Sequence, residues 1–508
     1  MKRIIEKEEF SKKLSKYPEE VIKLFSHLMN ANIYFFINKD KLVVFNAYGT
    51  PSKFYSVKSN IFTKIVKNKK LTFNDFKELK FKLEEFEVNS FTFLNRKNFI
   101  QKLEPKTKIT ELKINISNYC TLNCDYCFQK EKNTKRLTFE QCKEHIDSFM
   151  ETYKCQSFLL TLAMTSEPFL DLELIKQIYK YVQEKCLSQL KASTTKQDIY
   201  SFLGISSDEE YIKILNQRDY YKSSFKNMDK RFISDSLEKD LINIDFTSDK
   251  NEIQRINKEV IYTSLSASKD LYYLCLCTNG TIRPSKEDLA FIKKLYSYGP
   301  LNLSFDGDFK GNSHRKYPNG KPSYNDVLEN IRFFQDNGIK LKINCTITED
   351  NNDFLKLIKF FHKNNITDFK FNLKKGVYSK SLLKNIRKFY KAYYTHKIDS
   401  LYGFEKYGTN IYKDFIYLIN CEDCHRKCIG FDNKEYYCDY FIGNNLNLPK
   451  SGINVLRRNK CTNCPFALIC GGTCQAITRS TSINEKSCEV RQEIFKQIIY
   501  FTSELMLH

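Results

Sequence analysis

The chain has 508 residues, of which 42% are hydrophobic, so it is long enough for two to four domains with buried cores. Its formal net charge of +22 comes from Lys and Arg residues that are interleaved with acidic residues. This pattern argues against a nucleic-acid-binding stripe and suits an acidic peptide equally well. The first residues, MKRIIEKEEF, lack the apolar segment of a signal peptide, and no run of about eighteen apolar residues occurs. We therefore expect a cytoplasmic protein without a membrane span.

The first part of the chain predicts a small α+β unit. Residues 1–30 show helical spacing of apolar residues, and the pattern then changes to the strand-like segments NIYFFIN and KLVVFN around a polar turn. A third strand is expected around KFYSV, followed by helices near 59–68 and 73–85. We place this unit in residues 1–95.

From residue 111 onward, strand and helix patterns alternate, which predicts an α/β domain of parallel βα units over residues 108–400. The strands begin with ELKINIS and end with DFKFNL, which gives six units instead of the eight of a complete barrel. A charged tract, residues 187–266, interrupts the alternation and is interpreted as an insertion with helical pieces. Six units leave a barrel open on one side, where a large peptide can reach its top.

Three cysteines follow the first strand of this domain in the segment NISNYCTLNCDYCFQK. Cys120, Cys124 and Cys127 form a C-x3-C-x2-C run on one short loop. Three thiolates suit a 4Fe–4S cluster that keeps one iron open for a substrate or cofactor. The alternatives are a zinc knuckle, which needs a fourth ligand that the next dozen or so residues do not supply, and three unrelated cysteines.

This segment, with Tyr126 and Phe128 around its last thiol, resembles the signature of the radical SAM enzymes. The resemblance implies that S-adenosylmethionine is the cofactor, that it binds the open iron, and that Phe128 lies beside it. It also implies that residues 108–400 form a partial (β/α)6 barrel, similar to an incomplete TIM barrel.

Two further segments match cofactor-binding segments of this family. Thr165-Ser166-Glu167-Pro168 stands where the family usually has Gly-Gly-Glu-Pro, which grips the amino group of S-adenosylmethionine. Thr165 and Ser166 let the backbone approach a ligand less closely than glycines would, but Glu167 can still accept hydrogen bonds from an ammonium group. The turn Thr278-Asn279-Gly280 also ends a strand as the family does.

The strand PLNLSFDG places Ser304 and Asp306 like the family residues that line the methionine and ribose side of the cofactor. Arg315 resembles an arginine that often follows this strand and could pair with a carboxylate. Each of the three has an alternative interpretation as an ordinary residue of a surface loop.

A second group of cysteines lies near the C-terminus. In a chain without a secretion signal, cysteines are read as metal ligands and spare thiols. The segments CEDCHRKCIGFDNKEYYC and CTNCPFALICGGTC, followed by one more cysteine, resemble the SPASM domain of radical SAM peptide modifiers, and one or two zinc ribbons are the alternative. The resemblance implies an iron–sulfur domain in residues 415–508 with two auxiliary 4Fe–4S clusters. The candidate ligands are Cys421, Cys424, Cys428, Cys438, Cys461, Cys464, Cys470, Cys474 and Cys488.

By the same resemblance, the last cluster is held by Cys461, Cys464, Cys470 and Cys488, and Cys474 joins Cys438 and two earlier thiols at the other. Cys421, Cys424 and Cys428 offer three candidates for two places, and we favour Cys428 with one of the other two. Asn433 replaces the usual glycine of this segment, a tolerable change because asparagine can adopt positive φ. The remaining cysteines, Cys142, Cys155, Cys186, Cys275, Cys277 and Cys345, are predicted core residues.

Asp439 follows Cys438 directly. In the anaerobic sulfatase maturases, which are similar in both cysteine motifs, an aspartate in this place is the expected base for the proton of the substrate. An acid beside an electron-accepting cluster suits an oxidation, because the substrate loses a proton together with electrons. The alternative is a surface aspartate with no role.

Residues 1–95 resemble the winged-helix-like domains that capture a leader peptide as an added strand, with a plain packing domain as the alternative. The combined resemblance implies a radical SAM maturase of a ribosomally made peptide, with flavodoxin or ferredoxin as electron donor. It would form a thioether, as in sactipeptides and ranthipeptides, or another cross-link. The alternatives are a sulfatase-maturase-like enzyme that forms formylglycine, and a non-catalytic iron–sulfur or zinc protein that binds nucleic acid.

Overall fold

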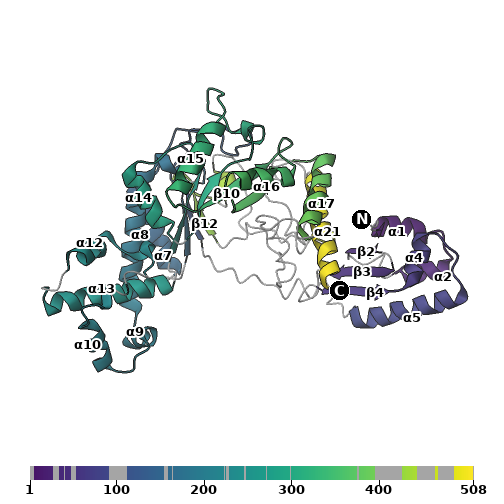
Figure 1. Ribbon diagram of the computed structural model, residues 1–508, viewed down its shortest axis with the longest axis horizontal. Helices are drawn as coiled ribbons and strands as arrows, with labels where there is room; N and C mark the ends of the chain where they lie inside the picture. The colour runs from purple at the N-terminus through teal and green to yellow at the C-terminus, as the bar shows by residue number, and fades with distance from the viewer. Residues whose placement is uncertain are drawn as a thin grey trace.

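The structure is a computed structural model. It describes residues 5–26, 34–38, 40–46, 53–90, 111–153, 158–162, 164–221, 224, 228–244, 248–269, 272–297, 299–374, 377–394, 426–436, 438–442, 464–466 and 485–506. In Figure 1 the N-terminal elements lie at one end of the molecule beside the helix α21, and the helices of the predicted insertion lie at the other end. The parallel strands lie between them.

The N-terminal unit is a four-stranded antiparallel sheet in the order β1-β2-β3-β4, with helices packed on it. Its elements are β1 (Ile5–Glu6), α1 (Lys7–Leu14), α2 (Glu19–Leu24), β2 (Tyr34–Asn38), β3 (Lys41–Asn46), β4 (Lys53–Lys58), α4 (Asn60–Val66) and α5 (Phe73–Ser90). The predicted strands and helices are confirmed, and β1 is an additional short strand within the segment predicted as helical.

Strand β2 is buried on both faces, although strands of a small sheet often have one face in water. Phe35 belongs to the unit's own core, whereas Tyr34 and Phe36 belong to the main core of the molecule. The ring centroids of Tyr34 and Phe466 are 5.0 Å apart, and those of Phe36 and Tyr500 of helix α21 are 5.8 Å apart. The N-terminal sheet is therefore docked on the C-terminal helix by aromatic contacts.

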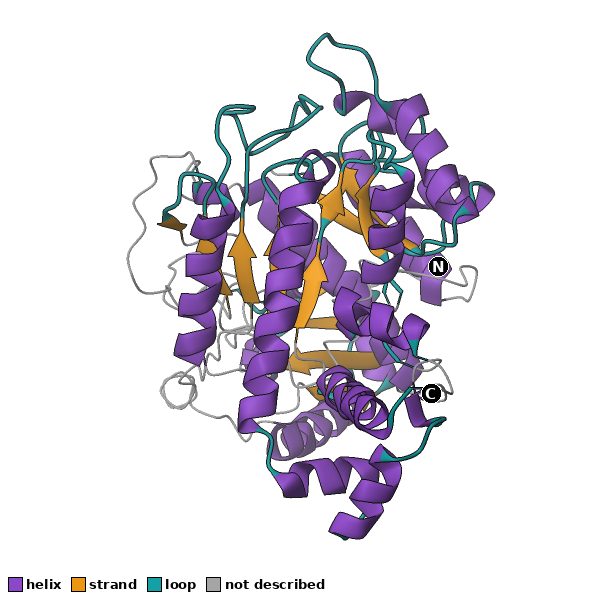
Figure 2. Ribbon diagram, turned by 90° about the vertical axis from the view of Figure 1, so that its left-hand side faces the viewer, coloured by secondary structure: helices purple, strands orange, loops and turns teal. Residues whose placement is uncertain are grey.

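The six predicted strands of the central domain are confirmed as parallel. The strands are β5 (Glu111–Ile114), β6 (Phe158–Leu162), β7 (Tyr272–Cys275), β8 (Cys277–Thr278), β9 (Leu301–Ser304), β10 (Leu341–Ile347) and β11 (Phe369–Leu373). Two segments, β5-β6-β7 and β8-β9-β10-β11, follow one another, and the third predicted strand is split between them at Leu276. Figure 2 shows these strands with helices in front of them.

Helices connect the strands as the alternation predicted. They are α7 (Phe139–Tyr153), α8 (Leu172–Ser193), α14 (Lys286–Leu295), α15 (Tyr324–Asp336), α16 (Phe354–Lys363) and α17 (Lys380–Tyr394), with the short 3-10 helices η1 (Pro168–Leu170) and η3 (Gly311–His314). Because successive side chains of a strand point to opposite faces, Leu112 and Ile114 enter the main core. Lys113 and Asn115 point to the other face.

That other face is concave. The thiol of Cys277 on β8 lies 3.5 Å from the side-chain amide of Asn344 on β10, although β9 runs between the two strands. In a flat sheet, the backbones of two strands separated by a third are about 10 Å apart and their side chains stand perpendicular to the sheet, so such side chains meet only where the sheet curves. We call the side of the parallel strands that carries Lys113, Asn115 and Cys277 the concave face.

The predicted insertion is helical and has small cores of its own. Its elements are α9 (Lys196–Leu203), α10 (Asp208–Leu215), η2 (Lys230–Phe232), α12 (Asp235–Asn243) and α13 (Lys250–Ser268). The N-terminal ends of α9 and α10 carry capping boxes from Thr195 and Ser207, which explains why this polar segment forms defined helices.

Near the C-terminus, β12 (Arg426–Ile429) pairs in parallel with β5, and β13 (Glu435–Tyr436) pairs antiparallel with β12. The sheet is thereby extended to β13-β12-β5-β6-β7, a pairing that the sequence did not predict. Asn433 between the two strands has a φ of 65°, which confirms that asparagine replaces glycine there at positive φ.

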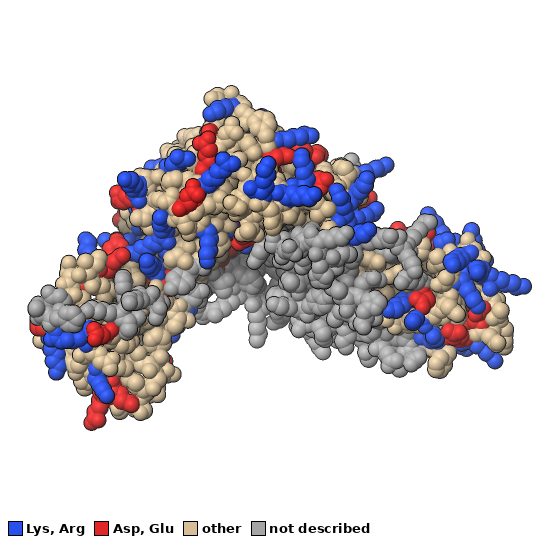
Figure 3. All heavy atoms as spheres, in the orientation of Figure 1, with Lys and Arg blue, Asp and Glu red and all other residues tan. Residues whose placement is uncertain are grey.

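Helix α21 (Glu485–Met506) packs against α17, where Arg387 donates two hydrogen bonds to Glu493 at 2.7 and 2.9 Å. None of the helices in the described part of the chain combines the length and apolar content that a bilayer span requires. On the face shown in Figure 3, Lys and Arg are dispersed, with Asp and Glu among them.

Candidate functional site

The loop after β5 carries the first three predicted cluster ligands and is closed by side chains. The side-chain oxygen of Asn118 accepts the backbone N–H groups of Thr134 and Lys135 at 3.0 Å. Asn133, at positive φ, accepts the backbone N–H of Cys120 at 2.9 Å. Asparagine thus holds both ends of the loop, so the loop is a defined unit and not a free connection.

The three thiols are half-buried on this loop. The sulfur of Cys120 accepts from the backbone N–H of Leu122 at 3.5 Å and from the side-chain amide of Asn279 at 3.6 Å. Burial raises the pKa of Cys124 to about 11; nearby Arg315 lowers it, and the neighbouring thiols Cys120 and Cys127 raise it further. The three sulfurs therefore interact electrostatically, and a bound cation would favour their ionised forms.

The donor set fits an iron–sulfur cluster in its chemistry. Amide hydrogen bonds to a cysteine sulfur, as on Cys120, are the contacts that tune cluster ligands. Within the described ranges, no three His, Cys, Asp or Glu side chains are grouped as they would be around a bound metal ion. The assignment of Cys120, Cys124 and Cys127 as ligands stays a prediction.

Glu167 connects this loop to two strands. Its backbone N–H donates to the carbonyl of Tyr119 at 2.7 Å, and its carboxylate is fully buried. One carboxylate oxygen accepts from the backbone N–H of Phe169 at 3.1 Å and the hydroxyl of Thr278 at 2.8 Å. The other oxygen accepts from the backbone N–H of Asn279 at 2.6 Å. Glu167 thus joins the ends of β6 and β8 to the cysteine loop.

Burial raises the pKa of Glu167 to about 7, although its hydrogen bonds oppose this shift. The structure gives the carboxylate internal partners, so its predicted contact with the ammonium group of S-adenosylmethionine stays a prediction. Two polar atoms nearby lack partners: the Ser166 hydroxyl oxygen and the side-chain oxygen of Asn115 are buried without a hydrogen bond. Both oxygens are suited to a polar ligand, but such atoms also occur away from this place, as in Asn257 and Thr263 of helix α13, so they do not by themselves mark a site.

Asp306 and Arg315 form a buried pair. The arginine donates to both carboxylate oxygens, at 2.9 and 3.2 Å, and the backbone N–H of Thr346 donates to the same carboxylate at 2.7 Å. Tyr126 adds a hydrogen bond from its hydroxyl, and its ring lies 5.5 Å from the arginine's central carbon. The predicted pairing of Arg315 with a carboxylate is confirmed. For both residues, the predicted contact with the cofactor stays a prediction.

Phe128 and Ser304 are the last two residues expected to contact the cofactor. Both are half-buried, and Ser304 lies at the end of β9 on the concave face. Its hydroxyl is 3.6 Å from the sulfur of Cys277. No measurement on this structure tests their contact with the cofactor, which stays a prediction.

Asp439 is buried beside Lys113 and Asn115 of the concave face, so it is not a surface residue. Lys113 of β5 lies 2.6 Å from one carboxylate oxygen, and the other accepts from the side-chain amide of Asn115 at 3.0 Å and the thiol of Cys428 at 3.5 Å. Burial alone would raise the pKa of Asp439, but Lys113 and these hydrogen bonds hold it below its ordinary value. Sequence reasoning missed Lys113, although a lysine between Leu112 and Ile114 in an apolar strand was visible.

Four of the nine C-terminal cysteines lie among the described residues. Cys428 and Cys438 are buried, and Cys464 and Cys488 are half-buried. The sulfur of Cys464 accepts from the side-chain amide of Gln492 at 3.8 Å. The other predicted ligands, Cys421, Cys424, Cys461, Cys470 and Cys474, lie outside the described residues.

The prediction of core positions for the six other cysteines is partly wrong. Cys142, Cys186 and Cys345 are buried in the main core, as expected. Cys155 lies outside the described residues. Cys275 and Cys277 are half-buried and point to the concave face, because Leu274 and Leu276, which alternate with them, take the core positions of this strand.

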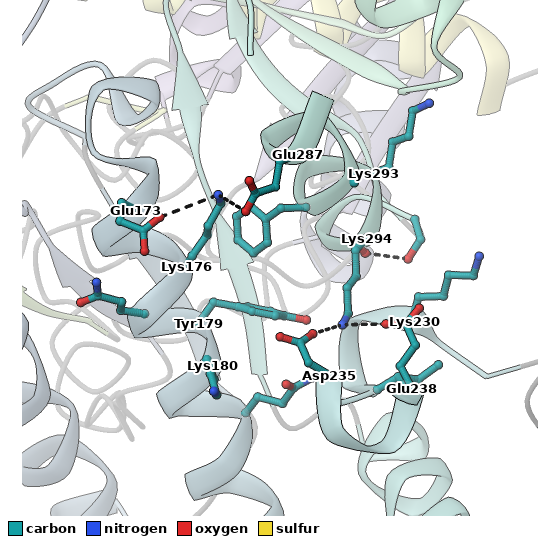
Figure 4. Close-up of a pocket in the computed structure, with 16 residues that line it drawn as sticks. Glu173, Lys176, Tyr179, Lys180, Lys230, Asp235, Glu238, Glu287, Lys293 and Lys294 are labelled. Atoms are coloured by element: carbon teal, nitrogen blue, oxygen red, sulfur yellow. Dashed lines mark hydrogen bonds and ion pairs between the residues drawn. The ribbon is translucent and has the colours of Figure 1, made fainter. Parts of the chain in front are cut away.

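A pocket of about 920 Å³ lies between α8, α12 and α14 (Figure 4). Two of its lysines form ion pairs: Lys176 lies 3.7 Å from Glu287 and 2.8 Å from Asp288, and Lys294 lies 2.9 Å from Asp235. None of the predicted site residues that the structure describes lines it. The pocket lies between the insertion and two helices of the central domain and has many charged residues in its lining. It does not belong to the candidate site.

No family model and no curated protein matches the chain. Among solved structures, native anSMEcpe with bound AdoMet is 15% identical, with a TM-score of 0.45, over 76% of this chain and 96% of that one. The same protein with AdoMet and the Cp18Cys peptide is 14% identical, with a TM-score of 0.46, over 78% and 99%. Streptococcus suis SuiB bound to S-adenosylmethionine is 13% identical, with a TM-score of 0.42, over 90% and 97%. anSMEcpe is an anaerobic sulfatase maturase, and SuiB is a radical SAM enzyme that acts on a ribosomally made peptide.

Proposed function

We propose that this chain is a radical SAM peptide maturase that forms a thioether or another cross-link in a ribosomally made peptide. The observation that carries the proposal is the Glu167 junction, which joins the cysteine loop to the ends of β6 and β8. The concave face of the same strands is polar and carries Lys113, Asn115 and Ser304. A protein that merely carried a cluster would need neither the junction nor a polar face beside it.

The proposed architecture is a partial (β/α)6 barrel in residues 108–400 between a peptide-recognition unit, 1–95, and an iron–sulfur domain, 415–508. Contacts between β8 and β10 across β9 support the curvature that a barrel requires. Parallel βα units place their functional residues at the carboxyl ends of the strands. The cysteine loop, Ser304 and the turn after β8 all lie at such ends.

The cluster and S-adenosylmethionine would supply a 5′-deoxyadenosyl radical when bound, and this chemistry belongs to the cofactors. The chain would hold the cluster with Cys120, Cys124 and Cys127. The partnerless oxygens of Ser166 and Asn115 are suited to polar groups of the bound cofactor. In this proposal Phe128 and Ser304 contact the cofactor directly, and the buried Asp306–Arg315 pair fixes the shape of the wall behind it.

Asp439 is proposed as the group that receives the proton of the substrate. Lys113 and Asn115 keep its carboxylate ionised and fixed in orientation, so it can accept a proton, although the lowered pKa makes it a weaker base than a free carboxylate. Its contact with Cys428 places it beside a proposed ligand of the first auxiliary cluster. Electron and proton would then leave the substrate on the same side of the site.

The N-terminal unit is proposed to bind the leader of the peptide. Strand β4 is the last strand of its sheet in the described part of the chain, and helix α5 contacts it. An open strand edge can accept a peptide as an added strand. Phe73 and Phe81 of α5 are 72% and 67% exposed, so their rings are accessible to a peptide bound beside this helix.

Two other functions remain as alternatives. A sulfatase-maturase-like oxidation of a Cys or Ser is favoured by Asp439 beside Cys428 and Cys438. A non-catalytic iron–sulfur or zinc protein that binds nucleic acid is disfavoured by the charge pattern, because Lys and Arg are interleaved with acidic residues and not gathered into one stripe. The electron donor would be a flavodoxin or ferredoxin.

The test uses the full chain, reconstituted without oxygen with iron and sulfide and supplied with a chemical reductant. We expect conversion of S-adenosylmethionine to 5′-deoxyadenosine and loss of this reaction when Cys120, Cys124 and Cys127 are changed together to Ala. Cys142→Ala is the matched control, because this thiol lies in the core and has no proposed ligand role. Equal turnover in the triple variant would refute the proposal.

A further inference from the structure

Two thiols that the proposed reaction does not use lie on the concave face. Cys275 ends β7 and Cys277 begins β8, and both are half-buried. Their neighbours Leu274 and Leu276 point into the main core with exposures of 2% and 0%. The two thiols therefore project toward the same side as Ser304 and Asn344, where a cofactor and a peptide would lie.

The thiols lie among polar groups, and charged side chains also act on them: Glu111 and Lys113 on Cys275, and Arg315 and Glu167 on Cys277. The sulfur of Cys275 accepts from the amide of Asn302 at 3.5 Å, and that of Cys277 accepts from the amide of Asn344 at 3.5 Å. Burial raises the pKa of Cys275 to about 12 and also raises that of Cys277. Both groups thus keep their S–H hydrogen at neutral pH, unlike the reactive thiolates of nucleophilic cysteines.

Cys277 is the better placed of the two. It immediately precedes Thr278 and Asn279, which donate to Glu167 at 2.8 and 2.6 Å. Asn279 also donates to the sulfur of Cys120 on the cysteine loop at 3.6 Å. The thiol thus lies on the strand that supports the proposed cluster and cofactor, on the face where a radical would form.

An S–H bond is weaker than the C–H bond of an unactivated carbon, so a thiol next to a carbon radical gives up its hydrogen atom. A role as a metal ligand is less suited, because the two sulfurs have amide and hydroxyl groups as hydrogen-bond partners in the described part of the chain. A packing role does not explain why these two positions of the strand face away from the core. Hydrogen-atom donation fits both the protonated state and the position.

We propose that Cys277 is a hydrogen-atom donor to carbon radicals formed on the concave face, an inference that rests on the proposed radical function. The carbon radical gains the hydrogen, a C–H bond forms, the S–H bond breaks, and a thiyl radical is left on Cys277. One electron from a low-potential iron–sulfur or flavin protein, with one proton from water, restores the thiol. Peptide carbons that do not close a cross-link would thereby leave the site with a restored C–H bond.

The test uses S-adenosylmethionine alone as the probe, in the reconstituted full chain in deuterated water. Thiol hydrogens exchange with this solvent, so Cys277 would carry deuterium and would pass it to the 5′-deoxyadenosyl radical when no peptide is present. We expect 5′-deoxyadenosine with one carbon-bound deuterium from the parent, and at least a tenfold smaller deuterated fraction from Cys277→Ala. Cys277→Ser should behave like the alanine variant, because a hydroxyl keeps the contacts but holds its hydrogen too strongly.

Cys345→Ala is the matched control, because Cys345 lies on β10 of the same sheet but is fully buried in the core. It should leave the deuterated fraction at the parent level. A second readout needs no cofactor: in the chain without iron, iodoacetamide should label Cys277 faster than Cys345, as their exposures differ. Equal labelling rates would contradict the placement of Cys277.

The outcomes separate the two levels of the proposal. 5′-Deoxyadenosine that forms without solvent deuterium in the parent, or with deuterium retained in Cys277→Ser, would overturn hydrogen donation and leave the radical function intact. Absence of 5′-deoxyadenosine from every variant would refute the proposed function, and hydrogen donation with it.

Discussion

Replacing Glu167 with Gln tests the junction that carries the proposed function. The carboxylate accepts backbone hydrogen bonds from Phe169 and Asn279 through its two different oxygens. A glutamine has one oxygen, so its NH2 group must face one of these N–H donors and leave it unsatisfied. A buried donor without a partner costs about 1–3 kcal/mol. Local opening around Asn279 should therefore become roughly 5- to 150-fold more frequent, since about 1.4 kcal/mol corresponds to a factor of ten.

The assay is hydrogen exchange of the backbone amides after β8 in the full chain, where this opening is seen without global unfolding. The parent should also show a pH effect. Because burial raises the pKa of Glu167 from its ordinary value of 4.5 to about 7 in the folded protein, the folded state holds an extra proton between these two pH values. Stability of this region should thus fall as pH rises from about 5 to 7, by at most about 3 kcal/mol, and the Gln variant should lack the effect.

The control is Glu173→Gln at the start of α8, because the side chain of Glu173 is 78% exposed. It should change neither the exchange rates nor their pH dependence. Unaltered protection of Asn279 in the Glu167→Gln protein would show that the junction contributes nothing to holding the turn, and the reasoning on Glu167 would be wrong.

Three further predictions concern other parts of the chain. Lys113→Met leaves Asp439 buried without its cation and should lower the free energy of unfolding of the metal-free chain by about 3–5 kcal/mol. Adding Asp439→Leu to this variant should recover most of the loss. A Lys113→Met protein as stable as the parent would contradict the buried pair. Three clusters imply about twelve iron atoms per chain on metal analysis, and four or fewer with zinc in the remainder would exclude the C-terminal thiols as cluster ligands. A chain that begins near Lys106 should still cleave S-adenosylmethionine but modify its peptide far more slowly. Added leader peptide should no longer compete with the precursor for this shortened chain. An unchanged modification rate would exclude leader recognition by residues 1–95.

Local patterns were sufficient for much of the fold and for part of the site. The period of two in the strands and the helical period between them predicted the six parallel units, because each unit is specified by residues close in sequence. Arg315 and Asp306 are only nine positions apart, so their pairing could be inferred from one loop. The positive φ of Asn433 followed from the SPASM resemblance, which implies a glycine at this position.

Contacts between distant segments could not be predicted in this way. The pairing of β12 with β5 joins residues more than 300 positions apart, and with it came the Lys113–Asp439 pair. The orientation of Cys275 and Cys277 was missed for a different reason. Alternation shows that Leu and Cys occupy opposite faces of the strand, but both residue types are common in cores, so the pattern alone does not say which face is concave.

The docked position of the N-terminal sheet changes how leader binding would act. Besides the aromatic contacts of β2, Lys496 of α21 lies 2.5 Å from Glu6, and the same helix is bound to α17 through Glu493 and Arg387. Helix α21 therefore contacts both the proposed recognition sheet and the central domain, and it also carries Cys488. A leader held on a docked sheet fixes the start of the peptide relative to the concave face, whereas a flexible tether only raises its local concentration. Leader recognition, if it occurs on β4, would thus select by distance which residues of the peptide reach the site.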